Sequence, residues 1–148
     1  MRYKLPVYGL RLVRESAVEY ADMEAVNNSR AVAELANRLL KDSPIEEFLV
    51  FFLDNQNRLI GMTRQKGTVN QTPVFPAEIF KVALTLGVTV SLIFLHNHPS
   101  GVLKPSPEDI RLHQKLVEAA RLFQMSVLDN LIVDGMGGHY SFHEAGIL

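Results

Sequence analysis

Residues 96–109 read HNHPSGVLKPSPED, and they follow the apolar run SLIFL at residues 91–95. On an extended segment, side chains two residues apart point to the same side. His96 and His98 can therefore direct both imidazoles at one point just past the end of a strand, while Asn97 points away. A buried strand that ends in two convergent histidines indicates either a metal site or a tightly packed turn.

A helix is predicted to begin within the same stretch, with Ser106 as its N-cap and Pro107 at its first position. Glu108 and Asp109 then lie at the positive end of the helix dipole, which favours acidic side chains. This geometry also brings the Asp109 carboxylate back over the strand end, giving two nitrogens and one oxygen with a fourth position open, as in catalytic zinc sites. The spacing alone leaves both interpretations of Asp109 open, helix capping and metal binding.

Outward from this stretch, the apolar pattern alternates between the periods of helices and strands. Helices are predicted over residues 29–43, with Ser29 as N-cap, 76–86 and 106–123, and strands over 46–54, 58–63, 88–95 and 126–133. Residues 67–74 are predicted to be loop or a short strand. The last helix is predicted to turn Leu112, Leu116, Ala119 and Phe123 inward. The fold class is therefore α/β, a mixed sheet with helices packed on it.

Composition limits the classes of function. The 148 residues, 47% apolar, suffice for one domain, and 15 basic residues nearly balance 16 acidic ones, so no net charge favours nucleic acid. There is no cysteine, which excludes disulfides and thiolate ligands. The most apolar stretch, residues 82–95, is too short to span a bilayer, and the N-terminus lacks the apolar run of a secretory signal. The expected location is the cytoplasm.

Other polar side chains are weaker candidates. Glu46 and Glu47 precede a buried strand, where they are either solvated or placed beside the metal as a proton carrier. His113 lies one helical turn after Asp109 and could be a further ligand, although an exposed position is the simpler expectation. His139 and His143 are expected at the surface.

The pattern His-x-His, with Ser106 eight residues after His98 and Asp109 three later, resembles the JAMM motif of the JAB1/MPN metalloprotease superfamily. The longer string HNHPSG-x-x-x-PS-x-x-D resembles the RadC-like branch of that superfamily. The resemblance extends over residues 26–147 and includes EEFLVFFLDNQNRLI, FPAEIF and VLDNLIV. It implies a single JAB1/MPN-like (cytidine-deaminase-like) domain over residues 26–148. Residues 1–25 would form an N-terminal extension, in which YGLRLV could add a strand.

The resemblance implies one Zn²⁺ ion held by His96, His98 and Asp109, with water as the fourth ligand. It also implies that Glu46 is the general base, with Glu47 as the alternative, and that Ser106 helps to stabilise a tetrahedral intermediate. The implied reaction is hydrolysis of a peptide or isopeptide bond by a water whose pKa the metal lowers. The implied partner is a protein or peptide substrate.

Three positions depart from the RadC-like pattern: Ala77 replaces an arginine, His113 a threonine, and Asn130 a histidine. None is a proposed ligand, so the departures bear on activity and substrate recognition rather than on metal binding. Two other functions stay open, a noncatalytic zinc-binding interaction module and a DNA-repair-associated factor. His/His/Asp ligands also suit metals other than zinc.

Overall fold

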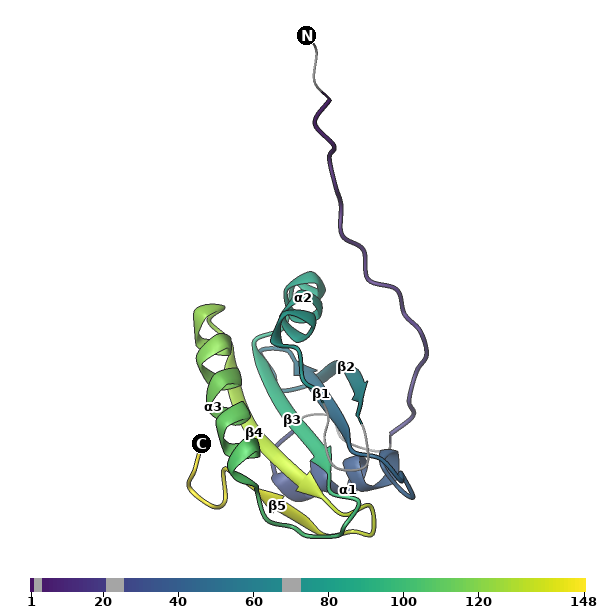
Figure 1. Ribbon diagram of the computed structural model, residues 1–148, viewed down its shortest axis with the longest axis vertical. Coiled ribbons are helices and arrows are strands. Elements are labelled where there is room, and N and C mark those ends of the chain that lie inside the picture. The colour runs from purple at the N-terminus through teal and green to yellow at the C-terminus, as the bar shows by residue number, and fades with distance from the viewer. Residues whose placement is uncertain (2–3, 21–25, 68–72) are drawn as a thin grey trace.

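The computed structural model describes residues 1, 4–20, 26–67 and 73–148, whose helices and strands are labelled in Figure 1. The helices in these ranges are α1 (Ser29–Leu39), α2 (Pro76–Leu86) and α3 (Pro107–Leu122). The strands are β1 (Glu47–Leu53), β2 (Leu59–Lys66), β3 (Ser91–Asn97), β4 (Ser126–Val133) and β5 (His139–Ser141). Most of the 67–74 segment, predicted as loop or short strand, lies outside the described residues.

The strands form one mixed sheet in the order β2-β1-β3-β4-β5. β1 pairs antiparallel with both β2 and β3, whereas β3 and β4 are parallel neighbours. Two parallel strands require a crossover connection, and α3 supplies it. Every residue of β1 and β3 is buried, which explains their continuous apolar sequences. The prediction of an α/β domain with a mixed sheet is confirmed.

Helices cover both faces of the sheet (Figure 1). On one face, Val32 and Ala36 of α1 and the C-cap residue Leu40 pack against Leu49, Phe51, Ile93, Leu95 and Leu131. On the other, α2 and α3 pack Ile79, Phe80, Ala83, Leu116 and Ala120 against Phe48, Val50, Phe52, Leu92 and Phe94. Fully burying one such side chain contributes about 1.5–3 kcal/mol. The sheet is therefore held rigidly between two cores, and its strand ends can position side chains accurately.

Proline and glycine set the bounds of α2 as predicted. Pro76 stands in its first turn, and Gly87 ends it with φ 74°, a left-handed conformation that glycine adopts without steric cost. For α1 the predicted N-cap is wrong by one residue: the side chain of Asn28 accepts the Ala31 N–H at 2.8 Å, while Ser29 contacts Glu144 instead. Asparagine and serine cap helices about equally well, so the sequence could not separate the two adjacent residues.

β3 extends two residues beyond its predicted end. His96 still pairs with Phe48 on β1 and with Ile132 on β4, and Asn97 pairs with Val133. The prediction that the histidines follow the strand is therefore wrong for His96, which lies within the sheet, and holds for His98.

The described part of the N-terminal segment, residues 4–20, extends away from the domain (Figure 1). It contains no helix or strand, so the strand considered for YGLRLV is not formed, and each of these residues is exposed. Its hydrogen bond to the domain runs from Arg38 Nη2 to the Glu19 carbonyl, at 2.6 Å. None of the helices in the described ranges is long and apolar enough to cross a membrane.

Candidate metal centre

The end of β3 presents two histidines on one side of the sheet. His96 is buried, and the N–H of His98 donates to the Val133 carbonyl at 3.0 Å, which holds the chain beside β4 beyond the strand end. Asn97 points to the opposite side, where its Oδ1 accepts the Glu47 N–H at 2.8 Å and its Nδ2 donates to the Ile45 carbonyl at 3.0 Å. The alternation predicted for residues 96 to 98 is confirmed.

The first turn of α3 supplies the carboxylate. Ser106 is the N-cap: its Oγ accepts the Asp109 N–H at 3.1 Å, and Asp109 Oδ2 accepts the Ser106 N–H at 2.7 Å. This reciprocal capping box fixes the Asp109 side chain over the end of β3. Capping and convergence with the histidines therefore occur together, and the two interpretations of Asp109 do not exclude each other.

Potential ligand atoms of three residues meet at this point. His96 Nε2 lies 3.0 Å from His98 Nε2 and 3.3 Å from Asp109 Oδ1, and His98 Nε2 lies 3.3 Å from Asp109 Oδ2. A tetrahedral ion with ligand bonds of about 2.0–2.1 Å would separate neighbouring ligand atoms by about 3.3 Å. The spacing fits such an ion, and the three residues could hold a divalent metal.

The hydrogen bond of the far ring nitrogen of His98 also suits metal binding. His98 Nδ1 lies 2.7 Å from the Val102 carbonyl oxygen, which can only accept, so this nitrogen carries the ring proton. In the neutral ring the Nε2 lone pair of His98 then faces Nε2 of His96, and in the protonated ring Nε2 carries a hydrogen that Asp109 accepts. Two facing nitrogens at 3.0 Å need a proton or a cation between them, and a carbonyl partner on the far nitrogen is the usual support of a metal-binding histidine.

Charge interactions within the cluster are strong. Burial opposes ionisation of Asp109, but its hydrogen bonds with His96 and His98 outweigh burial and hold the pKa of the carboxyl well below its usual range. The hydrogen bond to Asp109 raises the pKa of His98, against the effect of burial. Asp109 is therefore ionised and available as an anionic ligand.

The two adjacent glutamates face opposite sides of β1. Glu46 is half-buried and lines the same cleft as His96, His98 and Asp109. Glu47 is buried elsewhere, where Ser43 Oγ donates to its Oε1 at 2.7 Å and Arg64 Nε lies 3.2 Å from its Oε2. The geometry therefore favours Glu46 over Glu47 as the carboxylate beside the metal centre.

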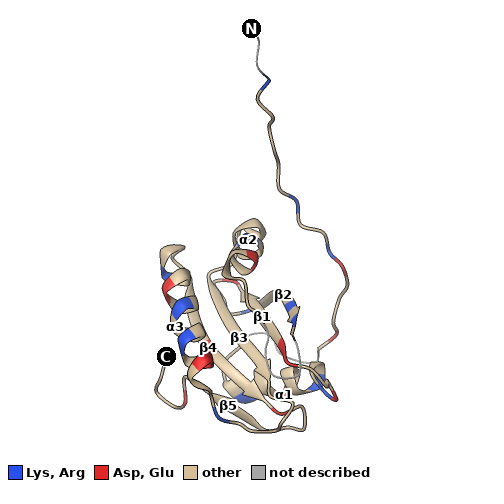
Figure 2. Ribbon diagram, viewed as in Figure 1, with Lys and Arg blue, Asp and Glu red and all other residues tan. Residues whose placement is uncertain are grey.

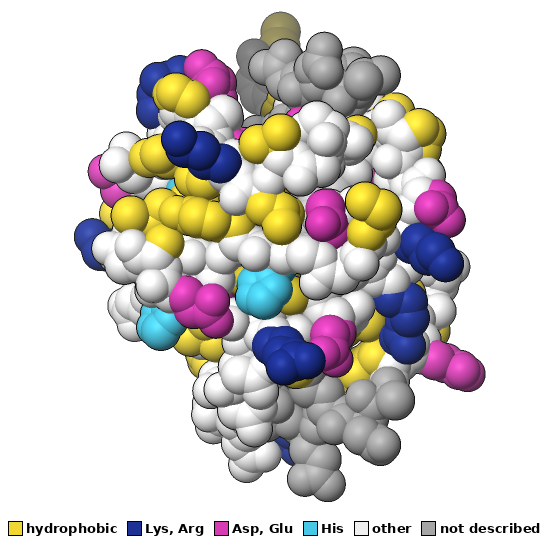
Figure 3. All heavy atoms as spheres, turned by 90° about the horizontal axis from the view of Figure 1, so that it is seen from below, with side chains coloured by type: hydrophobic (Ala, Val, Ile, Leu, Met, Phe, Trp, Pro, Cys, Tyr) yellow, Lys and Arg dark blue, Asp and Glu magenta, His cyan; other side chains and the backbone are white. Residues whose placement is uncertain are grey.

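The cleft has a volume of about 850 Å³, within the range of small-molecule and peptide sites. Its lining combines Glu46, Ser106 and the three potential ligands with the apolar side chains of Phe48, Pro73, Val74 and Leu112. Figure 3 views the end of the molecule at which β3 and β4 finish, and shows histidine side chains at the surface with acidic and hydrophobic side chains around them. The three residues that the resemblance implies as ligands, together with Glu46 and Ser106, lie in this one cleft, whereas Glu47 and His113 do not line it.

The expectation that His113 is exposed is wrong. His113, Leu116 and Ala120 form the buried face of α3, whereas Leu112 and Ala119 are half-buried and Phe123 is exposed. The His113 ring packs against Phe142, with ring centroids 4.8 Å apart, and its Nδ1 lies 3.3 Å from Asn130 Nδ2. His113 is not among the converging ligand groups of the described residues. Two positions that depart from the RadC-like pattern, 113 and 130, are thus in contact with each other.

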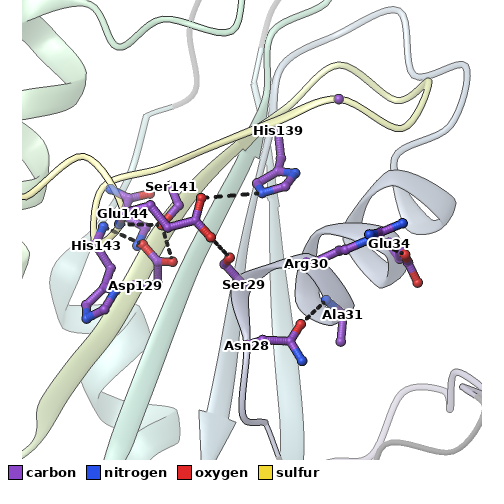
Figure 4. A network of polar contacts seen from close by, with 12 residues as sticks. Asn28, Ser29, Arg30, Ala31, Glu34, Asp129, His139, Ser141, His143 and Glu144 are labelled. Atoms are coloured by element: carbon purple, nitrogen blue, oxygen red, sulfur yellow. Dashed lines mark hydrogen bonds and ion pairs between the residues drawn. The ribbon is translucent and has the colours of Figure 1, made fainter.

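The C-terminal histidines belong to a separate polar network (Figure 4). Asp129 Oδ2 accepts from Ser141 Oγ at 2.6 Å, and its Oδ1 accepts the His143 N–H at 3.0 Å. His139 is half-buried, with its Nε2 3.9 Å from a Glu144 carboxylate oxygen, and His143 is exposed. These contacts fasten the chain after β5 to β4, and His143 takes part in them through its backbone N–H.

Comparison with known proteins gives the family. Residues 26–147 match the RadC-like JAB domain family. A UPF0758 protein of Janthinobacterium sp. (strain Marseille) is 42% identical over 141 residues, covering 94% of this chain and 62% of that protein. A UPF0758 protein of Photobacterium profundum is 45% identical over 113 residues, covering 76% and 50%. One of Thiobacillus denitrificans is 38% identical over 151 aligned positions, covering 99% and 66%.

The chain spans between one half and two thirds of the length of these relatives. The family match covers the mixed sheet, all three helices of the described residues and the cleft at the end of β3. By its sequence and its fold, the chain belongs to the RadC-like JAB domain family.

Proposed function

We propose that this protein is a metal-dependent peptidase or isopeptidase of the JAMM type, with zinc as its metal and a protein or peptide as its substrate. The observation that supports this most strongly is the convergence of His96, His98 and Asp109 in a cleft that also contains Glu46 and Ser106. The arrangement provides three protein ligands, with room beside them for a water and a substrate carbonyl.

Each side chain of the cleft has a role in this proposal. His96, His98 and Asp109 hold the ion, which when bound supplies a Lewis acid and a water of pKa near neutrality. The Glu46 carboxylate accepts a proton from the attacking water and then passes it to the leaving amine. The pKa of His98 is raised chiefly by its hydrogen bond to Asp109, and the Glu46 charge across the cleft adds to this rise.

Ser106 can serve the helix and the reaction at once. Its Oγ lone pair accepts the Asp109 N–H, which leaves the hydroxyl hydrogen to be donated into the cleft. A donor aimed at a developing oxyanion contributes about 3–4 kcal/mol to the stability of the transition state in other enzymes. The apolar side chains of Phe48, Val74 and Leu112 would exclude water and orient the substrate chain.

A noncatalytic zinc-binding module would need only the three metal ligands, and neither a general base nor a hydroxyl donor. The presence of Glu46 and Ser106 in the same cleft favours the enzyme, since neither is required to hold the ion. A DNA-binding factor has less support, because α3 carries both basic and acidic residues and the net charge is −1 (Figure 2).

The test is a screen of peptides and isopeptide-linked conjugates with four zinc-supplemented proteins: wild type, His96→Ala, Glu46→Gln and Glu47→Gln. We expect cleavage by wild type and Glu47→Gln. Glu46→Gln should bind zinc and lose at least about 100-fold in rate, the contribution of a general base, and His96→Ala should lose both metal and activity. Zinc binding without turnover on any substrate would support the noncatalytic module, and equal rates for wild type and Glu46→Gln would exclude Glu46 as the base.

A further inference from the structure

Two buried polar side chains connect α3 to the sheet close to the metal centre. His113 on α3 and Asn130 on β4 are each 2% exposed, and Asn130 Nδ2 lies 3.3 Å from His113 Nδ1. An amide nitrogen only donates, so the imidazole Nδ1 accepts and the ring proton lies on Nε2. Burial lowers the pKa of His113, which keeps the ring in the neutral form that this hydrogen bond requires.

This contact joins the elements that carry the metal ligands. His113 follows Asp109 by four residues, so both lie on the same face of α3. Asn130 pairs with Phe94 on β3, and His96 follows Phe94 by two residues on the same face of the sheet. Apart from the contacts of Asp109 with the histidines, this is the one side-chain hydrogen bond between α3 and the sheet among the described residues.

Asn130 carries a buried polar group that lowers the stability of the folded protein. Its Oδ1 is buried and has no hydrogen-bond partner among the described residues, and the residue lines the cleft. A leucine of similar volume would avoid the loss of solvation that this oxygen suffers. Local costs of this kind collect at functional sites, which indicates that the amide serves through its Nδ2 contact with His113.

We propose that His113 and Asn130 form a positioning pair, whose hydrogen bond fixes the start of α3 against β4 and holds Asp109 within reach of His96 and His98. The pair thereby sets the metal affinity of the site. The inference rests on the metal centre of the proposed function. Neither residue is a ligand; both act through Asp109. Residues that hydrogen-bond a ligand directly typically change metal affinity about 10- to 100-fold, and for this pair, which acts through the placement of α3, we expect an effect at the lower end of that range.

The test measures zinc affinity by competition with a chromophoric chelator, and the visible spectrum of the cobalt(II) form, which reports the coordination geometry. The proteins are wild type, His113→Leu, Asn130→Leu and the double variant. Each single variant should bind zinc at least about tenfold more weakly and show an altered cobalt spectrum. The double variant should lose little more, because both substitutions remove the same hydrogen bond.

Asn37→Leu is the matched control. Asn37 is also a buried asparagine with one hydrogen bond, to the Gly138 carbonyl at 3.1 Å, and an unpartnered Oδ1 among the described residues. It lies on α1, across the sheet from α3. The Asn37→Leu substitution should leave zinc affinity within about twofold of wild type, since sites without shared partners behave independently.

An exchange of the two residues separates the hydrogen bond from general packing. The protein with His113→Asn and Asn130→His keeps one imidazole and one amide across the same gap, and it should recover zinc affinity to within about threefold of wild type. Asn130→Ser, whose short side chain cannot span the gap, replaces Asn130→Leu if that variant does not fold.

Four results would overturn the inference. Wild-type affinity and an unchanged cobalt spectrum in both single variants would leave the metal centre standing without the positioning pair. A loss no larger than that of Asn37→Leu, or failure of the exchanged protein to recover, would attribute the effect to packing. Absence of zinc and cobalt binding in wild type would remove the metal centre and the positioning pair together.

Discussion

At the scale of single residues, the site depends on strand alternation. Glu46 and Glu47 are adjacent and chemically identical, yet one lines the cleft and the other pairs with Arg64 on β2. The same alternation sends Asn97 away from His96 and His98, where its amide ties β3 to the start of β1. One residue of register therefore separates a catalytic candidate from a structural one.

Glu47 is predicted to contribute to stability. Glu47→Gln removes the charge that Arg64 and Ser43 contact in a buried position, and it should lower the free energy of unfolding by about 1–2 kcal/mol. Urea unfolding checks this, with Glu34→Gln as control. Glu34 also pairs with an arginine, Arg30, but both side chains are exposed, so its change should stay within about 0.5 kcal/mol. Equal effects of the two substitutions would contradict the account.

His113 is predicted to make stability depend on pH. Its pKa in the folded protein is lowered, chiefly by burial, although Asp129 opposes the shift. Below the ordinary value of 6.5 the unfolded chain therefore takes up a proton that the folded protein does not. The contribution of neutral His113 to the free energy of unfolding is therefore complete above pH 6.5. This contribution decreases as the pH falls, by at most about 1.4 kcal/mol per pH unit.

Urea unfolding of the metal-free protein between about pH 8 and pH 5.5 checks this prediction. The cost of His113→Leu relative to wild type should shrink as the pH falls, because the variant lacks the group that is destabilised by protonation. A cost that is constant over this range would show that His113 does not titrate differently in the folded and unfolded states.

At the scale of elements, the first turn of α3 combines a helix cap with a metal ligand and a hydroxyl donor. Ser106→Ala should lower the free energy of unfolding by about 1 kcal/mol, whereas Ser106→Gly should cost only a few tenths, because glycine is a tolerable N-cap. Both should reduce turnover equally, since both lack the hydroxyl. Urea unfolding and cleavage rates measure the two effects, and a Ser106→Gly protein with wild-type rates would limit Ser106 to capping.

Helix and strand bounds were predictable where local chemistry sets them. Pro76 and Gly87 delimit α2, and Ser106 with Pro107 begins α3, because these residues favour one backbone conformation at a helix end. The end of β3 was not predictable, because its last residues are held by pairing with β1 and β4. Such pairing depends on residues far away in the sequence.

The candidate site was largely predictable from one motif. The spacing of His96, His98 and Asp109 reflects the alternation of side chains along an extended segment and a capped helix start, and both are local features. The burial of His113 was not predictable, because the helical spacing of the apolar residues places this histidine on the solvent side of the helix. Its burial depends on Asn130 and Phe142, which are distant in sequence and supply a hydrogen bond and a ring contact.

At the scale of the whole molecule, the sheet is packed between two hydrophobic cores, and residues 4–20 lie outside both cores. This segment exposes Leu5, Val7 and Tyr8 at 89%, 94% and 88%, and among the described residues its hydrogen bond to the domain is the one between Arg38 and Glu19. Removal of residues 1–20 should therefore change the free energy of unfolding by no more than about 0.5 kcal/mol. Urea unfolding of the shortened chain tests this, and a loss of several kcal/mol would show that the segment packs on the domain.

The central claim is that His96, His98 and Asp109 bind one metal ion, and elemental analysis of zinc-supplemented protein tests it most directly. Wild type and Glu46→Gln should each contain one zinc per chain, because Glu46 is not a ligand, and His96→Ala should contain none. A wild-type protein that takes up no metal, or a His96→Ala protein that retains zinc at the wild-type ratio, would contradict the account.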